Sequence, residues 1–277
     1  MRTTTLWILA LASLGALTGC FGEERLVASR DAELAADGAD TLAIDVGAGS
    51  LDVIGEAGRE TVQLDVALRT NRQAFSDDDG AEAALEVVLE RDDDRLVARV
   101  ALDDPPSGYF ADVVIRVPAR LGLTGRDGSG EAVIADVASL DLEDGSGTLD
   151  VSRVAGAVAI DDGSGELSLT EVGPTTIEDG SGTIAITGVE GDLSIDDEDG
   201  DLEVENVTGS VRLTLGSGNA RCVGVDGDVD VVDGSGDLYF EDVAGTVRVE
   251  DGSGDVEAVD VGALEMISDE SGEVDVR

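Results

Sequence analysis

The strongest constraint on the fold is a four-residue motif, Asp-Gly-Ser-Gly, that recurs along the C-terminal half of the chain. Nine copies or close variants follow one another at spacings of 17 or 18 residues. Glycine ends all nine, as expected where the backbone needs a positive φ or passes close to another segment. A fixed period of this length is typical of proteins whose units stack on one another. The copies start at Asp127, Asp144, Asp162, Asp179, Asp197, Leu215, Asp233, Asp251 and Asp269.

Between the motifs, apolar and polar residues alternate, which indicates strands rather than helices. In the unit that starts at Asp233, Leu238 and Phe240 alternate with polar residues, and Val247 and Val249 do so after a corner. Two strands this short bury too little surface to fold alone, whereas stacked units pair along a common axis. One corner position is valine in every complete unit, which implies a column inside the coils: Val137, Val154, Val172, Val189, Val207, Val225, Val243 and Val261.

These patterns predict an all-β fold, a parallel β-solenoid (β-helix) of about nine coils of 17–18 residues over residues 127–277. Apolar and polar residues also alternate in residues 41–126, as at 42–46, and this pattern predicts degenerate strands there. We expect them to form a strand-rich N-terminal cap or first coils, because a bare solenoid edge is open to pairing. Residues 81–90 fit a helix or a strand, and both remain open. Residues 20–40 are polar and acidic without a clear period, and we expect a lipidated N-terminus followed by a tether.

Residues 1–19 predict a secretory signal peptide. Arg2 gives a positive start, and the mostly apolar run that follows is too short to span a bilayer. The run ends in Leu17-Thr18-Gly19-Cys20, which resembles a bacterial lipobox. The resemblance implies lipidation of Cys20, so that acyl chains hold the mature protein on a membrane. By the sorting pattern of Gram-negative lipoproteins, Phe21 in place of aspartate favours the outer membrane.

Composition excludes several kinds of function. The chain has 62 acidic and 17 basic residues, a formal net charge of −45, and no histidine; every basic residue is arginine. Without histidine there is no Ser-His-Asp catalysis and no HExxH zinc site. Without lysine there is no Walker A motif. The negative charge excludes nucleic acid as a partner, because phosphate binding depends on basic side chains.

Stacking places the first aspartates of the motifs above one another at about 4.8 Å, where like charges repel. Three explanations remain open. Each carboxylate can accept hydrogen bonds from its own turn, high external salt can screen the charges, or Ca²⁺ can bind between neighbouring turns. The calcium hypothesis makes weak candidates of four residues, and we expect no other cofactor: Asp144, Asp162, Asp179 and Asp197.

Two rows of outward positions differ from the rest of the repeat. Arg221 and Tyr239 occupy equivalent positions on successive coils. Arg212 and Arg248 occupy equivalent positions on the other strand, with Asp230 on the coil between them. They predict a surface binding patch or, alternatively, ordinary cross-strand pairing with a cation–π contact. Cys222 aligns with inward apolar positions, so we expect a buried small hydrophobic residue rather than a reactive thiol.

Segment 112–130 reads DVVIRVPARLGLTGRDGSG. Its Val117-Pro118 step, followed by the Gly-Ser-Gly turn and the long repeat series, resembles the bacterial putative-adhesin β-strand-repeat family, which is related to the head domain of autotransporter-like adhesins. The resemblance covers about residues 41–277. It implies a β-solenoid on an envelope-anchored protein, and it brings no catalytic residues with it.

These features predict a non-catalytic, lipid-anchored cell-envelope protein with an adhesin-like, surface-interaction or structural role. We expect the membrane as one partner, through Cys20, and an envelope or extracellular protein or polysaccharide as another. An enzyme is not expected, because every turn carries similar carboxylates and no catalytic pair stands out. Two alternatives remain open: a periplasmic cation-binding or envelope-stress-associated module and, more distantly, a polysaccharide-active β-helix enzyme. The sequence leaves open whether the chain faces the periplasm or the cell surface.

Overall fold

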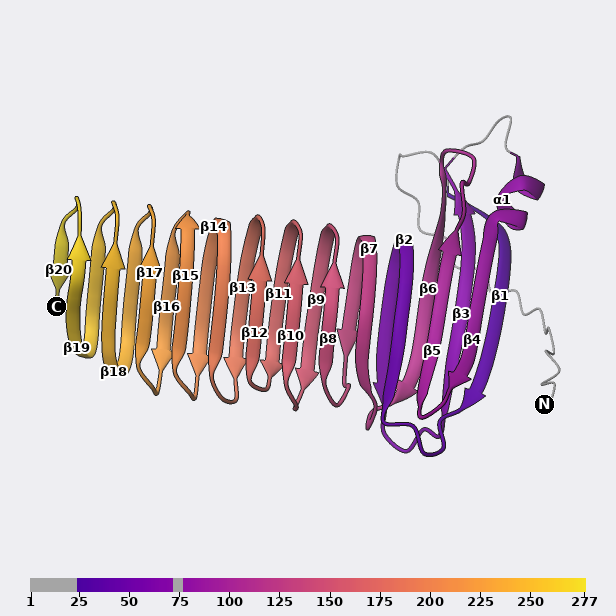
Figure 1. Ribbon diagram of the computed structural model, residues 1–277, viewed down its shortest axis with the longest axis horizontal. Helices are drawn as coiled ribbons and strands as arrows, with labels where there is room; N and C mark the ends of the chain where they lie inside the picture. The colour runs from indigo at the N-terminus through magenta and orange to yellow at the C-terminus, as the bar shows by residue number, and fades with distance from the viewer. Residues whose placement is uncertain (1–23, 72–76) are drawn as a thin grey trace. The chain divides into compact units, whose positions relative to one another are not determined.

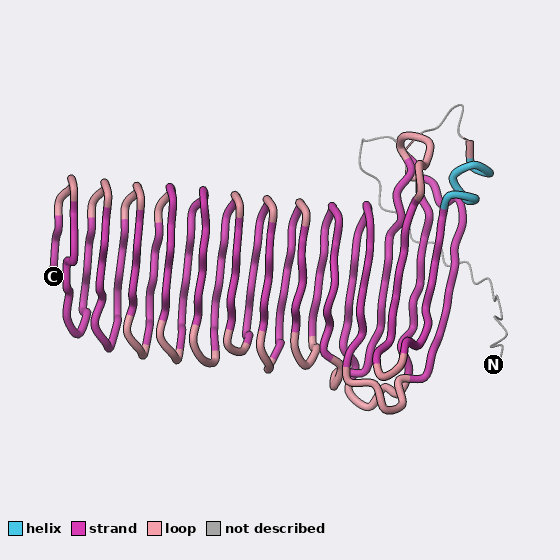
Figure 2. The backbone as a smooth tube through the Cα atoms, in the orientation of Figure 1, coloured by secondary structure: helices cyan, strands magenta, loops and turns pink. Residues whose placement is uncertain are grey.

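The computed structural model describes residues 24–71 and 77–277. The expected signal peptide and Cys20 therefore lie outside the described residues. The chain divides into two compact units, Met1–Glu131 (unit 1) and Ala132–Arg277 (unit 2), and each is described by itself. Both are built mainly of β-strands (Figures 1 and 2). Within the described ranges, no helix has the length and apolar character needed to cross a membrane.

Strand β2 of unit 1 pairs with different strands along its two halves. Its residues 41–46 pair in parallel with β5, and its residues 51–56 pair in parallel with β6. Beyond these, β5 pairs with β4, while β6 pairs with β3 and β3 with β1, all antiparallel. The described elements are β1 (Arg25–Ala35), β2 (Thr41–Glu56), β3 (Thr61–Thr70), α1 (Asp78–Ala84), β4 (Leu85–Asp92), β5 (Arg95–Leu102), β6 (Tyr109–Pro118) and the beginning of β7 (Gly122–Ala135).

The core of unit 1 follows the predicted alternation. Along β3, every second residue from Val62 to Leu68 is buried, and the residues between them are half-buried. Leu42, Ile44 and Val46 of β2 are buried in the same way. The apolar face of each strand therefore supplies the interior, and the polar face is left outside.

The expectation of a tether at residues 20–40 is wrong for residues 25–35, which form β1. This strand pairs with β3 along its length, and half-buried residues alternate with exposed ones. Small alanines at half-buried positions conceal the alternation from a reading based on large apolar residues. Two ion pairs also tie β1 to α1: Arg25–Asp78 at 2.8 Å and Arg30–Glu82 at 2.6 Å.

Residues 81–90, left open by the sequence, divide between a helix and a strand. Asp77 caps the start of α1, because its side chain accepts a hydrogen bond from the backbone N–H of Gly80. From Leu85 the chain is extended and pairs with β5 as β4. Both readings of this segment were therefore correct for part of it.

Unit 2 is a series of coils whose strands stack side by side (Figure 1). Equivalent strands of successive coils pair in parallel and in register, for example β8 with β10 and β9 with β11. This confirms the predicted parallel β-solenoid. After the end of β7 the strands are β8 (Leu140–Asp144), β9 (Gly147–Val154), β10 (Val158–Asp162), β11 (Gly165–Val172), β12 (Thr175–Asp179), β13 (Gly182–Val189), β14 (Leu193–Val207), β15 (Val211–Ser217), β16 (Ala220–Val225), β17 (Val229–Asp233), β18 (Leu238–Asp251), β19 (Val256–Asp269) and β20 (Val274–Val276).

The predicted valine column lies in the interior of unit 2, except that Val261, its last member, is only half-buried. Val154, Val172 and Val189 are direct neighbours in the parallel ladder, and each is at most 1% exposed. The residue before each of these valines has a positive φ, as for Glu171 at 56°. The residue with positive φ is left out of the pairing, so the chain turns a corner while the valine keeps its register.

The glycine that ends each turn is required by close contact between coils. Gly165 has a φ of 147°, a region that residues with a side chain rarely adopt. A Cβ atom added to it would lie 1.9 Å from the carbonyl oxygen of Gly147 on the preceding coil. The same close approach recurs where Gly182 stacks on Gly165. The repeated glycine therefore sets the spacing of the coils at this corner.

Candidate functional site

The aspartates that begin the turns face the interior of unit 2. Neighbouring members are register partners, as Asp162 is to Asp179. From Asp144 to Asp251 they are only 2–6% exposed, whereas Asp269, which begins the last turn, is exposed. Leu215 takes the equivalent position between Asp197 and Asp233 and interrupts the series. We call these residues the aspartate column: Asp144, Asp162, Asp179, Asp197, Asp233 and Asp251.

Three members of the column accept hydrogen bonds from their own turns. The hydrogen bonds that the first of the three explanations requires are therefore present at those three aspartates, and whether they offset the repulsion stays a prediction. Calcium binding stays a prediction, and the described residues include no group of three or more His, Cys, Asp or Glu side chains that could hold a metal ion. The bonds, each 3.2 Å long, run to the Oδ1 atoms of Asp162, Asp179 and Asp197 from the backbone N–H groups of Ser164, Ser181 and Asp199.

Burial raises the pKa of carboxyl groups in the column. The pKa values of Asp162, Asp197 and Asp233 rise to about 6, because burial disfavours the charged form and neighbouring carboxylates add repulsion. The pKa values of Asp179 and Asp251 are also raised, chiefly by burial. These groups therefore take up protons at a higher pH than ordinary surface aspartates do.

Arg221 and Tyr239 meet on adjacent coils, as the sequence suggested. The guanidinium carbon of Arg221 lies 4.7 Å from the centroid of the Tyr239 ring. Arg221 also forms ion pairs with Glu203 at 3.7 Å and with Glu241 at 3.4 Å. The Tyr239 hydroxyl donates to Glu241 at 3.1 Å. This geometry is that of cross-strand pairing with a cation–π contact, and a binding role for it stays a prediction.

Arg212 and Arg248 lie on the other ladder of strands, so the four predicted patch residues form two separate clusters. Arg248 contacts Asp228 at 3.1 Å, Asp230 at 3.2 Å and Glu265 at 3.3 Å. The side chain of Arg212 is 73% exposed, and its ion pair with Asp230 is long, at 3.9 Å. Arg212 is therefore less engaged by its neighbours than Arg248 is.

Sequence reasoning missed a polar trough in unit 1. It has a volume of about 750 Å³ and is lined by residues of β1, β2, β3 and β6. The small side chains of Ala67 and Val114 lie between polar neighbours and leave the surface hollow. Arg30 and Arg69 also line it, and Arg69 pairs with Asp112. The lining carboxylates outnumber these arginines: Asp31, Glu33, Asp52, Asp65 and Asp112.

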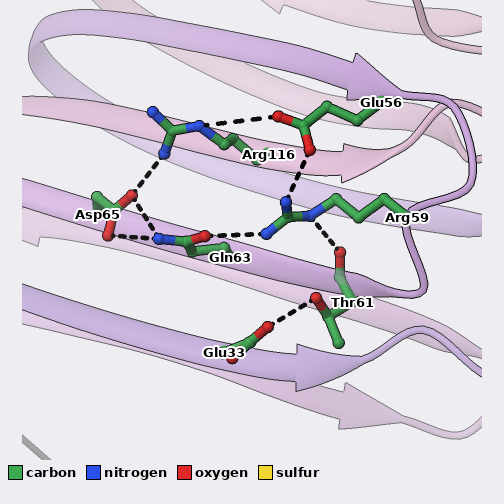
Figure 3. A network of polar contacts seen from close by, with 7 residues as sticks. All are labelled: Glu33, Glu56, Arg59, Thr61, Gln63, Asp65 and Arg116. Atoms are coloured by element: carbon green, nitrogen blue, oxygen red, sulfur yellow. Dashed lines mark hydrogen bonds and ion pairs between the residues drawn. The ribbon is translucent and has the colours of Figure 1, made fainter.

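A connected set of polar contacts fixes Gln63 and Asp65, two of the side chains that line the trough (Figure 3). Arg116 donates to Asp65 at 2.7 Å and lies 3.9 Å from Glu56. Arg59 donates to Glu56 at 2.8 Å and to the Oε1 atom of Gln63 at 2.9 Å. The amide of Gln63 in turn donates to Asp65 at 3.0 Å. Each of these side chains has at least two partners, so the network holds the trough wall in one arrangement.

Comparison with known proteins identifies the family. The Toastrack DUF4097 family matches residues 42–276. No functionally curated protein matches the sequence. Similar solved structures include a putative adhesin from Bacteroides fragilis, at 14% identity and a TM-score of 0.37, covering 90% of this chain and 96% of that one. Another is a putative cell adhesion protein from Clostridium sporogenes, at 13% identity and a TM-score of 0.29, covering 90% of this chain and 98% of that one.

These two structural likenesses are too distant to carry an argument about function. The family match covers most of the chain and extends over parts of both units, and it confirms the family resemblance seen in the sequence. The chain belongs to the Toastrack DUF4097 family.

Proposed function

We propose that the protein is a non-catalytic, lipid-anchored protein of the cell envelope that makes adhesin-like contacts with an envelope or extracellular protein or polysaccharide. The observation that carries the binding role is the polar trough of unit 1. It is concave, its wall is held by the Arg116–Asp65 network, and its volume of about 750 Å³ suits a small ligand or a segment of a polymer.

The trough offers both donors and acceptors to a partner. Asp31 and Asp52 line it, and neither has a hydrogen bond or ion pair from its side chain within the described structure. Their carboxylates can accept hydrogen bonds from hydroxyl, amide or ammonium groups. Arg30 and Arg69 supply donors beside them. The network already fixes Gln63 and Asp65 in the wall, so these two side chains lose little entropy when a ligand binds.

The anchor and the envelope location rest on Leu17-Thr18-Gly19-Cys20. Acyl chains on Cys20 would hold the two β-rich units at a membrane surface. The non-catalytic role rests on composition and repetition. The chain lacks the histidine and lysine on which most acid–base and nucleophilic sites depend, and equivalent carboxylates recur from coil to coil.

Retention of cells on coated surfaces tests this function. Cells that carry the wild-type protein would be compared with cells that carry the double variant Asp31→Asn and Asp52→Asn, on immobilised envelope polysaccharide and, separately, on immobilised envelope protein. We expect the wild type to raise retention on one of the two coatings and the double variant to lose most of that gain. The reason is that amides cannot replace charge-assisted acceptors.

The matched control is the double variant Asp161→Asn and Asp196→Asn. It makes the same change in charge at exposed aspartates of unit 2. We expect it to keep wild-type retention. Equal retention by the two double variants, or no gain over cells that lack the protein, would contradict the proposed contact surface.

A further inference from the structure

The aspartate column brings carboxyl groups together in the interior of unit 2. Among the described residues, five members of the column have no arginine partner. Register partners in a parallel ladder are about 4.8 Å apart, and repulsion between charges strengthens in the low-dielectric interior. The five residues are Asp162, Asp179, Asp197, Asp233 and Asp251.

Several oxygen atoms of the column are buried without a hydrogen-bond partner. They include Oδ2 of Asp179 and both side-chain oxygens of Asp233 and of Asp251, although the backbone N–H groups of Ser235 and Ser253 lie near enough to lower the pKa values of those two carboxyls in part. An ionised carboxylate only accepts hydrogen bonds, so two of them cannot satisfy each other. Asp233 and Asp251 are register partners close enough to share a hydrogen bond once one of them carries a proton. The unsatisfied oxygens therefore point to a proton as the missing group.

We infer that the aspartate column is a proton-binding device, in which neighbouring carboxyl groups share protons as the pH falls to mildly acidic values and thereby stabilise the coils of unit 2. Each proton converts a pair of repelling acceptors into a donor and an acceptor. The O–H group of one carboxyl then donates to the carboxylate oxygen of the next. At higher pH the protons leave, and the repulsion between coils returns.

The groups that face the column are themselves acidic or apolar. Asp197 faces Asp179 on β12, and its own strand adds Asp196 and Asp199. Its other register partner is Leu215 on β15. Asp162 has Asp144 and Asp179 as its acidic neighbours. Asp233 has Asp251, and Asp251 has Asp269.

The direction of the pH effect follows from these shifts. The pKa values of Asp162, Asp197 and Asp233 rise from 3.8 to about 6 in the folded protein. The folded state therefore binds protons more tightly than the unfolded state does. Stability is gained as the pH falls through about 6 toward 4, and it is lost as the pH rises through about 6. Each of these groups shifts the folding equilibrium by up to about a hundredfold.

Asp197→Asn tests the inference, with Asp196→Asn as the matched control on the same strand. Asp197 is buried and Asp196 is exposed, so the two variants remove the same charge from the inside and from the outside. The new amide at position 197 can keep the bond from the Asp199 N–H and can also donate to Oδ2 of Asp179. It thus imitates the protonated state at every pH.

The measurement is the unfolding temperature of the purified protein between pH 4.5 and pH 8, in 1 M salt to screen surface charges. We expect the wild type and Asp196→Asn to become more stable as the pH falls from 8 to 5. Asp197→Asn should be more stable than the wild type at pH 8 and should gain less on acidification. Loss of wild-type stability over this range, or an equal gain in both variants, would overturn the inference.

Infrared titration of the wild type gives a second readout that does not depend on a variant. The C=O stretch of a protonated carboxylic acid is separate from the bands of the ionised group. We expect part of this band to be present at pH 6 and to titrate with a midpoint near 6. A band that appears only near the pH of ordinary aspartate titration, at about 4, would also overturn the inference.

Discussion

The guanidinium of Arg221 lies over the ring of Tyr239 on the next coil, 4.7 Å from its centroid. Both side chains also contact Glu241, so the three form one cluster on the outside of unit 2. In-register stacking produces this cluster, because Arg221 and Tyr239 are direct partners in the ladder of β16 and β18. The repeat therefore turns an 18-residue spacing in the sequence into a side-chain contact.

A double-mutant cycle with Arg221→Gln and Tyr239→Leu measures this contact. We predict a coupling of about 0.5–1 kcal/mol in the free energy of unfolding, the range for a cation–π pair at an exposed site. Urea unfolding of the four proteins supplies the measurement. A control cycle pairs Arg212→Gln, on the other ladder, with Tyr239→Leu. The changes in the free energy of unfolding should be additive in this control cycle. Additive changes in the first cycle as well would contradict the contact.

Gly165→Ala should disrupt the stacking of coils. An added Cβ would lie 1.9 Å from the carbonyl oxygen of Gly147, which is backbone and cannot rotate away. Gly38→Ala is the control, because Gly38 has a φ of 70° and nothing within 4 Å of the added atom. We predict that the control lowers the free energy of unfolding by about 1–2 kcal/mol, because of its backbone conformation alone. Gly165→Ala should lower it by more. Equal losses in thermal unfolding would disagree with the close approach.

Cys222 should be unreactive in the folded protein. It is fully buried between Val204 and Phe240 in the ladder, and burial raises the pKa of its thiol to about 12. We predict that a maleimide reagent labels it only when denaturant or heat opens unit 2. The labelling rate would then report the opening of the coils. Rapid labelling under native conditions would show that this part of the core is accessible.

Leu215 interrupts the aspartate column, and restoring an acid there should increase the dependence of stability on pH. We predict that Leu215→Asp is less stable than Leu215→Asn at pH 8 by about 2–3 kcal/mol, as for a pKa shift of about two units. The difference should disappear near pH 4, where the new carboxyl is protonated. Comparing the two variants cancels the loss of the leucine side chain. A difference that does not change with pH would contradict a buried, ionisable position.

The solenoid could be predicted from the sequence because several local signals agree. The spacing of the turns, the alternation between them and the repeated valine all require stacked coils. The same alternation also held an unused signal for the inward aspartates. Val158, Ile160 and Asp162 occupy alternate positions of β10 and are all buried, whereas Asp161 is exposed. An apolar residue, Leu215, occupies the same column, which also indicates that the column faces inward.

The trough and β1 could not be predicted in the same way. The trough combines residues of four strands that do not repeat, and no local pattern brings Asp31 opposite Asp65. Strand β1 is held by its pairing with β3 and by ion pairs to α1, and its apolar contacts are few, such as that of Val27 with the cluster around Leu68. Long-range pairing of this kind leaves only a weak signal in a single sequence.

Protease accessibility on cells is the most direct test of the proposed function. The protein, with a tag after Arg277, would be treated with a broad-specificity protease on intact cells and on permeabilised cells. A periplasmic protein serves as the control and must stay intact until permeabilisation. We predict that the tag is lost on intact cells, because adhesin-like contacts with an extracellular partner require surface exposure. Protection of the tag until the cells are permeabilised would contradict that role.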